Sequence, residues 1–240
     1  MLAGKSYWIV GASEGLGRAL ARTLDAQGAR LVLSARGSDR LRDLAGELQD
    51  ARPLPMDVSD PASVAAAFER VGEIDGLVYC AGQYEPLTAQ NWDVDAVDGM
   101  CEVNFRGAIR VLGHVIPGFI TRNQGHIVLI GSLAGFRGLP GAIGYGASKA
   151  ALMHLGENLD ADLRDTAVKV QVVNPGFIKT RLTEKNDFAM PFIQTPEQAA
   201  EHVLKAMRST RFSTSFPRPF SWLFSLGRFF PRSLFYRVFR

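Results

Sequence analysis

Tyr145 and Lys149 place a phenol and an ammonium four residues apart, with only small residues between them. The surrounding residues, 142–163, predict a helix, because four leucines recur at helical spacing while charged residues occupy its other faces. Residues i and i+4 of a helix lie on one face. The two side chains therefore point the same way and have room around them, which is one half of an acid–base site.

Short apolar runs alternate with helical runs along most of the chain. We predict strands, most of them continuously apolar as in a parallel sheet covered on both faces, at residues 6–10, 29–35, 51–57, 76–80, 125–131 and 168–174. Helices are predicted at residues 16–27, 38–49, 61–71, around 97–122, 142–163 and 196–207. Residues 211–216 offer a seventh strand. This order predicts an α/β fold: a Rossmann-like doubly wound parallel sheet of six to seven strands, with helices on both faces.

The 240 residues, 47% of them hydrophobic, are enough for one large core. No repeat or flexible linker interrupts them, so we expect a single domain over residues 1–210, with residues 211–240 as a C-terminal extension packed on or beside it. Cys80 and Cys101 are not spaced as a pair, which favours a reducing, cytoplasmic setting. We find no secretory leader or membrane-spanning run. The four histidines lack metal-ligand spacing, so no metal is expected.

Residues 11–17, GASEGLG, follow the first predicted strand and open the first predicted helix. Glycines there allow a tight turn and a close backbone approach to a pyrophosphate, and the helix start presents free N–H groups to it. The spacing is GxxxGxG rather than GxGxxG, so a plain strand-to-helix turn stays an alternative.

The second predicted strand ends in Ala35 and Arg36, where a site for NAD usually has Asp or Glu. An arginine there can pair with a 2′-phosphate. We therefore expect NADP(H) as the preferred cofactor and NAD(H) as the less favoured one, the alternative being that Arg36 is a solvated surface residue.

Several short motifs follow one another in a recognisable order. They are GASEGLG at the first turn, CAG after the fourth strand, Val103-Asn104 in the long helix, Ser132 after the fifth strand, YGASK, and Asn174-Pro175-Gly176 after the sixth. Together they resemble the short-chain dehydrogenase/reductase family in its single-domain form, over about residues 5–210. The resemblance implies an oxidoreductase whose catalytic tetrad is Asn104, Ser132, Tyr145 and Lys149.

The resemblance also implies a role for each member of the tetrad. Tyr145 is the general acid in carbonyl reduction and the base in the reverse direction. An unperturbed phenol has a pKa of about 10, so we expect Lys149 to lower it and to bond the nicotinamide ribose. Ser132 would polarise the substrate carbonyl, and Asn104 would hold a water that links Lys149 to solvent. The cofactor supplies the hydride.

The remaining cofactor contacts implied by the resemblance lie in the loops that follow the strands. They are Gly11, Ser13, Gly15, Leu16 and Gly17 at the phosphates, Asp57 and Val58 at the adenine, Ala81 and Gly82 beside the ribose, and Pro175, Gly176, Ile178 and Thr180 at the nicotinamide and phosphates. The chain departs from the family pattern at Val10, where Thr is common, and at Tyr79-Cys80, where Asn-Asn is common. Those positions brace loops, so we expect changes in local geometry rather than in proton transfer.

Two segments, residues 133–143 and 178–194, are expected to face the substrate. Their apolar members are Phe136, Leu139, Phe188, Met190 and Phe192. Such walls suit a hydrophobic carbonyl or alcohol better than a sugar, so we expect a small-molecule substrate of that kind. Another reading is an NADP(H)-binding sensor or scaffold protein that uses the C-terminal tail as an interaction surface; the complete tetrad argues against it. A nucleotide-sugar epimerase or dehydratase is disfavoured, because such relatives usually carry a larger substrate domain.

The last thirty residues hold eight of the fifteen phenylalanines, and no Asp or Glu follows His202 while eight Lys or Arg do. Such a segment can bind a membrane surface, contact a partner subunit, or cap the chain's own substrate cleft. The rest of the chain is acidic, so no nucleic acid is expected. We expect a homo-oligomer, a dimer or tetramer, that is cytoplasmic or peripheral at the inner face of a membrane.

Overall fold

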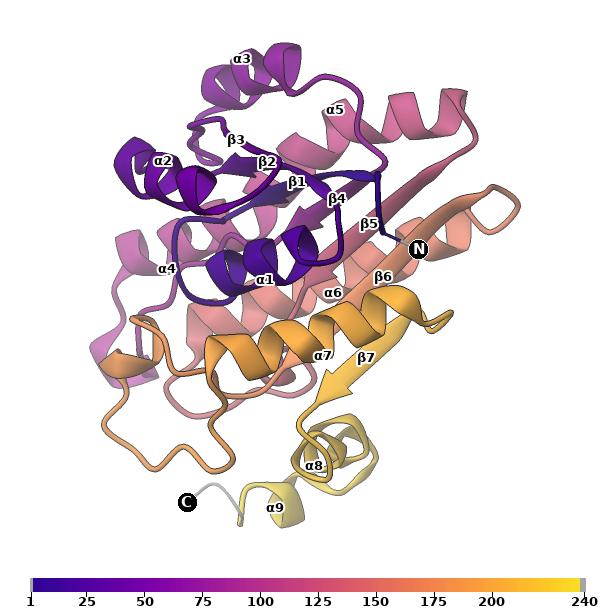
Figure 1. Ribbon diagram of the computed structural model, residues 1–240. Coiled ribbons are helices and arrows are strands. Elements are labelled where there is room, and N and C mark those ends of the chain that lie inside the picture. Colours follow the sequence, from indigo (N-terminus) through magenta and orange to yellow (C-terminus); the bar gives the residue numbers. More distant parts are fainter. Residues whose placement is uncertain (1, 238–240) are drawn as a thin grey trace.

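The computed structural model describes residues 2–237. Its centre is a seven-stranded sheet of order β3-β2-β1-β4-β5-β6-β7, in which neighbouring strands are parallel (Figure 1). The strands are β1 (Ser6–Val10), β2 (Arg30–Ser34), β3 (Ala51–Pro53), β4 (Gly76–Tyr79), β5 (Gly125–Ile130), β6 (Val168–Pro175) and β7 (Ser213–Phe216). This is the doubly wound sheet that the sequence predicts, including its seventh strand.

Two strand boundaries differ from expectation in an informative way. The third strand ends at Pro53 instead of extending to residue 57, although the N–H groups of Leu54 and Met56 still donate to the Leu33 and Ala35 carbonyls; Pro53 and Pro55 stand at alternate positions of this edge strand, where no N–H is needed. At the other edge, β7 lies within residues 211–240, so the sheet reaches into the segment assigned to the extension. The part of that segment outside the sheet begins at residue 217.

The helices follow the predicted order. They are α1 (Gly15–Asp25), α2 (Ser38–Glu47), α3 (Pro61–Val71), α4 (Val94–Cys101), α5 (Gly107–Thr121), α6 (Ile143–Asp162), α7 (Pro196–Arg208), α8 (Phe220–Ser225) and α9 (Arg232–Phe235). A π-helical segment, η2 (Glu102–Arg106), joins α4 to α5. Single 3-10 turns are η1 (Ala89–Asn91), η3 (Leu133–Gly135), η4 (Thr183–Lys185) and η5 (Gly227–Phe229). The long helix expected around residues 97–122 is thus continuous but changes its winding in the middle.

Both faces of the sheet are covered by helices, as β1 illustrates. Tyr7 and Ile9 pack in the core layer that contains α1, α2 and α7. Trp8 and Val10 point to the opposite layer, which contains α3, α5 and α6. Figure 1 shows α1 and α7 side by side on the first of these faces. Alternate residues of one strand therefore serve two cores, which explains why the strand reads as continuously apolar.

The helix starts divide into capped and uncapped ones. Asp60 accepts a hydrogen bond from the Ala62 N–H at the start of α3, and Thr195 with Gln198 forms a capping box on α7. At the start of α1, in contrast, the Glu14 side chain makes no capping hydrogen bond. The first-turn N–H groups of α1 are therefore left for another acceptor.

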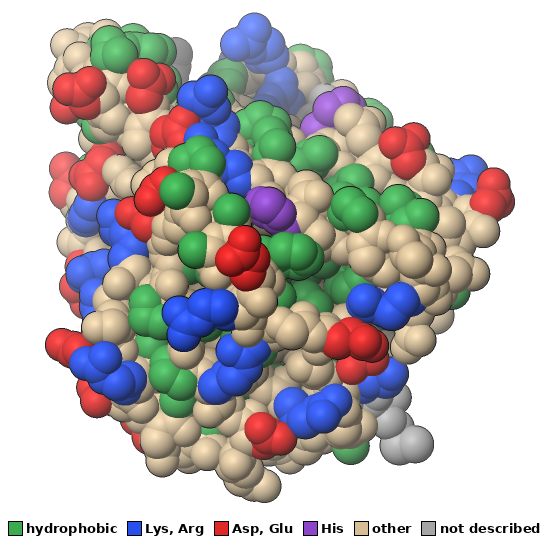
Figure 2. All heavy atoms as spheres, turned by 90° about the horizontal axis from the view of Figure 1, so that it is seen from above, with side chains coloured by type: hydrophobic (Ala, Val, Ile, Leu, Met, Phe, Trp, Pro, Cys, Tyr) green, Lys and Arg blue, Asp and Glu red, His purple; other side chains and the backbone are tan. Residues whose placement is uncertain are grey.

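The end of the molecule seen in Figure 2, which lies away from α8 and α9, carries basic and acidic side chains interspersed with isolated apolar ones. Within residues 2–237, no helix combines the length and the apolar character needed to span a bilayer.

Candidate active site

Ser132, Tyr145 and Lys149 converge beyond the carboxyl end of β5. Ser132 starts the turn η3, and its Oγ accepts a hydrogen bond from the Ala134 N–H at 3.1 Å. Tyr145 lies in the first turn of α6, close enough to the Ser132 side chain for that side chain to lower the pKa of the phenol. The buried Lys149, one turn later, donates from Nζ to the Ile130 carbonyl at 2.8 Å and lies 5.9 Å from the centroid of the Tyr145 ring. The structure thus brings three of the four predicted tetrad members together.

The expected direction of the Tyr145 pKa is wrong for this structure. Burial raises the pKa of the Tyr145 phenol, the Ser132 side chain lowers it, and Tyr84 and Cys80 raise it further. Lys149 is itself desolvated, so burial lowers its pKa to about 8, which the Cys80 thiol partly opposes. The ammonium is held by the Ile130 carbonyl, and removal of both groups from water outweighs the attraction that we expected between them.

Asn104 lies in the π-helical segment η2 and makes its hydrogen bonds to residues outside the tetrad. Its Nδ2 donates to the Gln83 carbonyl at 3.0 Å and to Ser148 Oγ at 2.9 Å, and its Oδ1 accepts from the Gln83 N–H at 2.7 Å. The side chain thereby ties the loop after β4 to α6. A Cβ built on Gly82 would lie 3.6 Å from Asn104 Oδ1 and 3.8 Å from Lys149 Nζ, so both side chains lie beside this loop. A water held by Asn104 stays a prediction.

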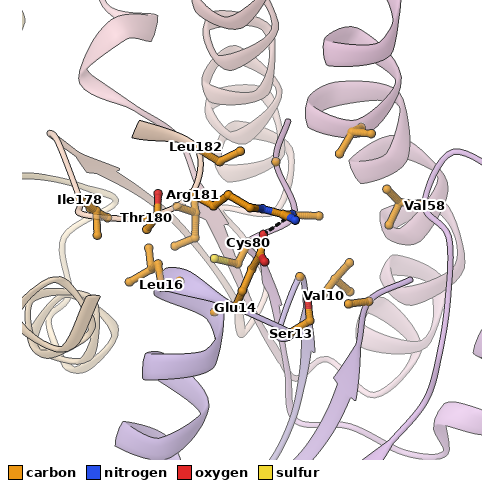
Figure 3. Close-up of a pocket in the computed structure, with 18 of the residues that line it drawn as sticks. Val10, Ser13, Glu14, Leu16, Val58, Cys80, Ile178, Thr180, Arg181 and Leu182 are labelled. Carbon is orange, nitrogen blue, oxygen red and sulfur yellow. Dashed lines mark hydrogen bonds and ion pairs between the residues drawn. The ribbon is translucent and has the colours of Figure 1, made fainter. Parts of the chain in front are cut away.

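A cavity of about 240 Å³ lies at the carboxyl ends of β1, β2, β4, β5 and β6 (Figure 3). All sixteen residues expected to bind the cofactor line it: Gly11, Ser13, Gly15, Leu16, Gly17, Arg36, Asp57, Val58, Ala81, Gly82, Tyr145, Lys149, Pro175, Gly176, Ile178 and Thr180. The crevice beside β1 and β4 is where a doubly wound sheet reverses its strand order, which is the usual ligand position in such folds.

The glycine loop of this cavity is shaped for a phosphate group. Gly11 has φ 94°, and a Cβ there would lie 2.5 Å from the Ala81 nitrogen. A Cβ on Gly17 would collide with the Gly11 carbonyl oxygen, so α1 can start close to the loop only with glycine at this position. The uncapped N–H groups of α1 face the same space. The residues present therefore fit a dinucleotide whose pyrophosphate rests on the helix start.

Four cationic side chains line the cavity: Arg36, Arg40, Lys149 and Arg181. They outnumber the carboxylates there, Glu14 and Asp57. The pKa of Asp57 lies below its ordinary value. Burial raises it, but hydrogen bonds from Ser59 and the positive charge of Arg36 together lower it. The cavity thus carries an excess of positive charge, as a ligand with several phosphates requires.

Sequence reasoning missed a bridge across this cavity. Glu14 accepts ion pairs from Arg40 and from Arg181, each at 2.6 Å, and Figure 3 shows Glu14 and Arg181 reaching toward one another. Arg40 lies in the first turn of α2, four residues after Arg36, so the sequence offered a second basic residue beside Arg36. Arg181 lies about 140 residues farther along the chain, and no local pattern connects it to Glu14.

A second cavity, of about 690 Å³, adjoins the first. Its walls are mainly apolar and come from the turn after β5, the loop after β6 and the helix α8. Of the five apolar residues expected to face the substrate, Leu139 and Phe188 line it; Phe136 packs instead under the tail, and Met190 and Phe192 do not line the cavity. The tail residues Phe220, Leu223 and Phe224 complete the wall. Capping of the chain's own cleft was one of the three roles open for the tail.

The two departures from the family pattern have local structural consequences. Tyr79 is fully buried, and its hydroxyl donates to the Val103 carbonyl at 2.5 Å, which braces β4 against the residue preceding Asn104. Cys80 and Val10 line the cofactor cavity. Burial raises the pKa of the Cys80 thiol to about 11, so it stays protonated. Cys80 also contributes to raising the pKa of Tyr145 and of Lys149, so this departure acts on the proton-transfer groups as well as on local geometry.

Comparisons with known proteins agree with this geometry. The model of the family described as short chain dehydrogenase matches residues 5–190. An uncharacterized oxidoreductase of Myxococcus xanthus (strain DK1622) is 36% identical over 238 residues, covering 95% of this chain and 93% of that protein. A solved short chain dehydrogenase/reductase family protein superposes with a TM-score of 0.83 and 30% identity, covering 89% of this chain and 96% of that one. A short-chain dehydrogenase from Sphingobium yanoikuyae in complex with NADPH superposes with a TM-score of 0.83 and 27% identity, covering 90% and 89%. The chain therefore belongs to the short-chain dehydrogenase/reductase family of oxidoreductases.

Proposed function

We propose that this oxidoreductase uses NADP(H) to interconvert a carbonyl and an alcohol on an apolar small molecule. The observation that carries the proposal is the position of Tyr145, which lines both the glycine-loop cavity and the apolar cavity. A proton donor at that shared wall reaches a substrate in one cavity beside a cofactor in the other. When bound, the cofactor supplies the hydride.

The chain's own residues account for the proton and the developing charge. Burial keeps the Tyr145 phenol protonated at neutral pH, so it is ready to donate to the oxygen of a carbonyl that is being reduced. Ser132 also lines the apolar cavity, and its hydroxyl can donate to the same oxygen. Lys149 holds a positive charge beside the Tyr145 ring, which favours the phenolate left after proton transfer.

The preference for NADP(H) is supported by two basic side chains that follow β2, Arg36 in the loop and Arg40 in the first turn of α2. Arg36 and Arg40 line the cavity next to the loop where an acidic residue would bind the ribose hydroxyls of NAD. The relative from Sphingobium yanoikuyae was solved with NADPH. We therefore expect NADPH to bind more tightly than NADH.

The preference for an apolar substrate is supported by the larger cavity. Its volume suits a substrate of drug-like size, and Leu133, Leu139, Phe177 and Phe188 line it together with the tail aromatics. The polar groups that accompany them include Ser132, Tyr145 and Asn186. Few polar groups in an apolar wall orient one functional group of a substrate and leave the rest to hydrophobic contact.

The test is NADPH consumption with aldehydes and ketones of increasing alkyl chain length, together with quinones and 3-oxoacyl esters. We expect kcat/KM to rise with chain length until the cavity is filled, by up to roughly fourfold per methylene. Tyr145→Phe keeps the ring and removes the proton donor, so turnover should vanish while NADPH binding persists.

Turnover that is equal in Tyr145→Phe and in the wild type would contradict the catalytic assignment. Tight NADPH binding without turnover of any panel member would favour the sensor or scaffold function. Loss of NADPH binding in Tyr145→Phe would point to a misfolded variant, and Ser132→Ala would then carry the test.

A further inference from the structure

The C-terminal cap, residues 217–237, has an inner and an outer side. On the inner side Phe224 and Phe235 are buried against Leu133, and Phe220 and Leu223 reach the apolar cavity. Arg137 fastens this packing, because its guanidinium donates to the carbonyls of Gly227 and Phe230, the latter at 2.9 Å. The cap is therefore held in one position on the domain rather than being a loose tail.

The outer side of the cap is apolar and exposed. Trp222 lies on α8, and Leu226 is the residue that caps its C-terminal end and donates its N–H to the Trp222 carbonyl at 2.9 Å; the two are one helical turn apart and thus share a face, and both are more than half exposed. Phe230 and Leu234, before and within α9, are half exposed. We refer to these four side chains as the outer cap surface. A rigid segment that buries one set of aromatics and presents another set to solvent is suited to a second apolar environment.

The exposed apolar area continues along the loop between β6 and α7. Phe188 and Phe192 of that loop are half exposed or more, and the Phe192 ring lies 5.6 Å from the Phe220 ring of the cap. Phe188 also lines the apolar cavity. Figure 1 shows this loop and the cap at the same end of the molecule. The rim of the cavity and the exposed aromatics therefore form one region.

The charged side chains of the cap itself are all positive. Arg218, Arg232 and Arg237 of the cap are exposed, and the chain contains no Asp or Glu after Glu201. The loop between β6 and α7 carries side chains of both charges. Two of its cations are already paired, Lys185 with Glu85 and Arg181 with Glu14. The cap itself thus offers aromatics flanked by uncompensated arginines.

We propose that the outer cap surface docks on an anionic lipid bilayer. Tryptophan and phenylalanine partition into the headgroup region, and arginines beside them are attracted by anionic lipids. Docking there places the rim of the apolar cavity against the membrane, where an apolar substrate is concentrated. This access to substrate rests on the proposed function, whereas the docking itself does not.

A second copy of the chain is the less favoured occupant on electrostatic grounds. A two-fold interface brings the same patch of both subunits together. Joining two outer cap surfaces would set Arg218, Arg232 and Arg237 near their own equivalents, with no carboxylate on either cap to compensate. An anionic bilayer complements this charge, whereas a second copy repeats it.

The experiment is co-sedimentation of the full chain with vesicles of phosphatidylcholine alone or mixed with phosphatidylglycerol. We expect pelleting with the mixed vesicles, a weaker signal with phosphatidylcholine alone, and a loss of binding at high salt. Neutralising the three arginines as Arg218→Gln, Arg232→Gln and Arg237→Gln should weaken binding to the mixed vesicles by roughly a hundredfold.

A matched pair of tryptophan variants tests how much the apolar side chains of the outer cap surface contribute to vesicle binding. Trp222 is 52% exposed on the cap and Trp92 is 56% exposed elsewhere, so Trp222→Ala should weaken vesicle binding by roughly tenfold or more, while Trp92→Ala should not. NADPH binding reports that each variant is folded. Tyr145→Phe should still pellet with vesicles, so failure of the enzymatic proposal and failure of the docking proposal are distinguishable.

Two results would overturn the proposal. One is wild-type protein that stays in the supernatant with mixed vesicles at low salt. The other is a Trp222→Ala variant that pellets like the wild type but shifts the oligomeric state in sedimentation-velocity experiments, which would assign the outer cap surface to a second copy.

Discussion

Glu14 accepts an ion pair from Arg181 across the mouth of the cofactor cavity, at 2.6 Å, and so joins the loop after β1 to the loop after β6. Its other oxygen receives Arg40 at 2.6 Å. One carboxylate thus occupies two cations that a phosphate-bearing ligand would otherwise attract, and it places a negative charge near that ligand.

From this geometry we expect Glu14→Gln to tighten NADPH binding. The pairs are partly exposed, so the gain should be modest, a decrease in Kd of roughly twofold to fivefold measured by fluorescence titration. Glu47 is a matched control, because it also pairs with two arginines, Arg18 and Arg22, but lies outside the cavity. A Kd that rises in Glu14→Gln would mean that the bridge holds the loops in the binding conformation.

Arg36 should determine the choice between the two cofactors. Replacing it by alanine removes a charge-assisted contact to a 2′-phosphate, so the ratio of kcat/KM for NADPH to that for NADH should fall by roughly tenfold to a hundredfold. Arg42→Ala is the control, since Arg42 is 64% exposed on α2 and pairs with Asp39. An unchanged ratio in Arg36→Ala would assign Arg36 to the solvated surface.

The sheet and the cofactor loop could be predicted because their signals are local. Most of the strands are continuous apolar runs, and residues 11–17 carry the turn, the glycines and the helix start within seven positions. Tyr145 and Lys149 are related by one helical turn, so their common face follows from spacing alone. Ser132 could be identified as a site residue only from the order of the motifs along the whole chain.

The parts that could not be predicted depend on contacts between distant segments. The ion pair of Glu14 with Arg181 and the packing of Phe220 against the apolar cavity have no local signature. The direction of the Tyr145 pKa was wrong for a related reason, because sequence spacing places Lys149 near the phenol but does not report how far both are removed from water.

Arg137 should be a positioning residue for the wall of the substrate cavity. Its guanidinium lies 4.7 Å from the centroid of the Phe235 ring and bonds two carbonyls of the cap. Arg137→Ala should therefore raise KM for long-chain substrates severalfold and leave kcat/KM for the shortest aldehyde unchanged. Arg122 is the matched control, because it also combines an aromatic ring, Phe119, with a backbone carbonyl, but far from the cap.

Limited proteolysis gives a readout for Arg137 that is independent of activity. A loosened cap should be cleaved faster in Arg137→Ala than in Arg122→Ala or the wild type. Equal cleavage rates together with unchanged KM values for all chain lengths would contradict the positioning role.

The pH dependence of carbonyl reduction should follow Lys149. Burial lowers its pKa to about 8 and raises that of Tyr145, so below pH 8 both carry their protons. Above pH 8 Lys149 loses its charge, and kcat/KM, which reports groups of the free enzyme, should fall by up to about tenfold per pH unit. Lys149→Arg keeps the charge at high pH, so its lower activity should show no such fall; a wild-type profile that stays flat to pH 9.5 would exclude this role.

His126 should make the folded state sensitive to acid. Gln171 donates its amide N–H to the carbonyls of Ala206 and Arg211, so its Oε1 faces His126 Nε2 at 2.9 Å, while Tyr7 reaches Nδ1 at 2.9 Å. Nε2 therefore carries a proton, and in the neutral imidazole Nδ1 accepts from the Tyr7 hydroxyl. Burial, aided by Lys169 and opposed by Gln171, lowers the pKa of His126 from its ordinary value of 6.5 to about 4.

Because the unfolded chain then binds more protons than the folded one between pH 6.5 and pH 4, the free energy of unfolding must fall as the pH falls through that window. One pKa unit corresponds to about 1.4 kcal/mol, so the titration of His126 should lower the free energy of unfolding by roughly 2 kcal/mol between pH 6.5 and pH 5. Urea unfolding at the two pH values measures it. His126→Asn should reduce this loss, whereas His154→Asn, at a side chain that is 73% exposed, should leave it unchanged; equal losses in both variants would show that other groups set the acid limit.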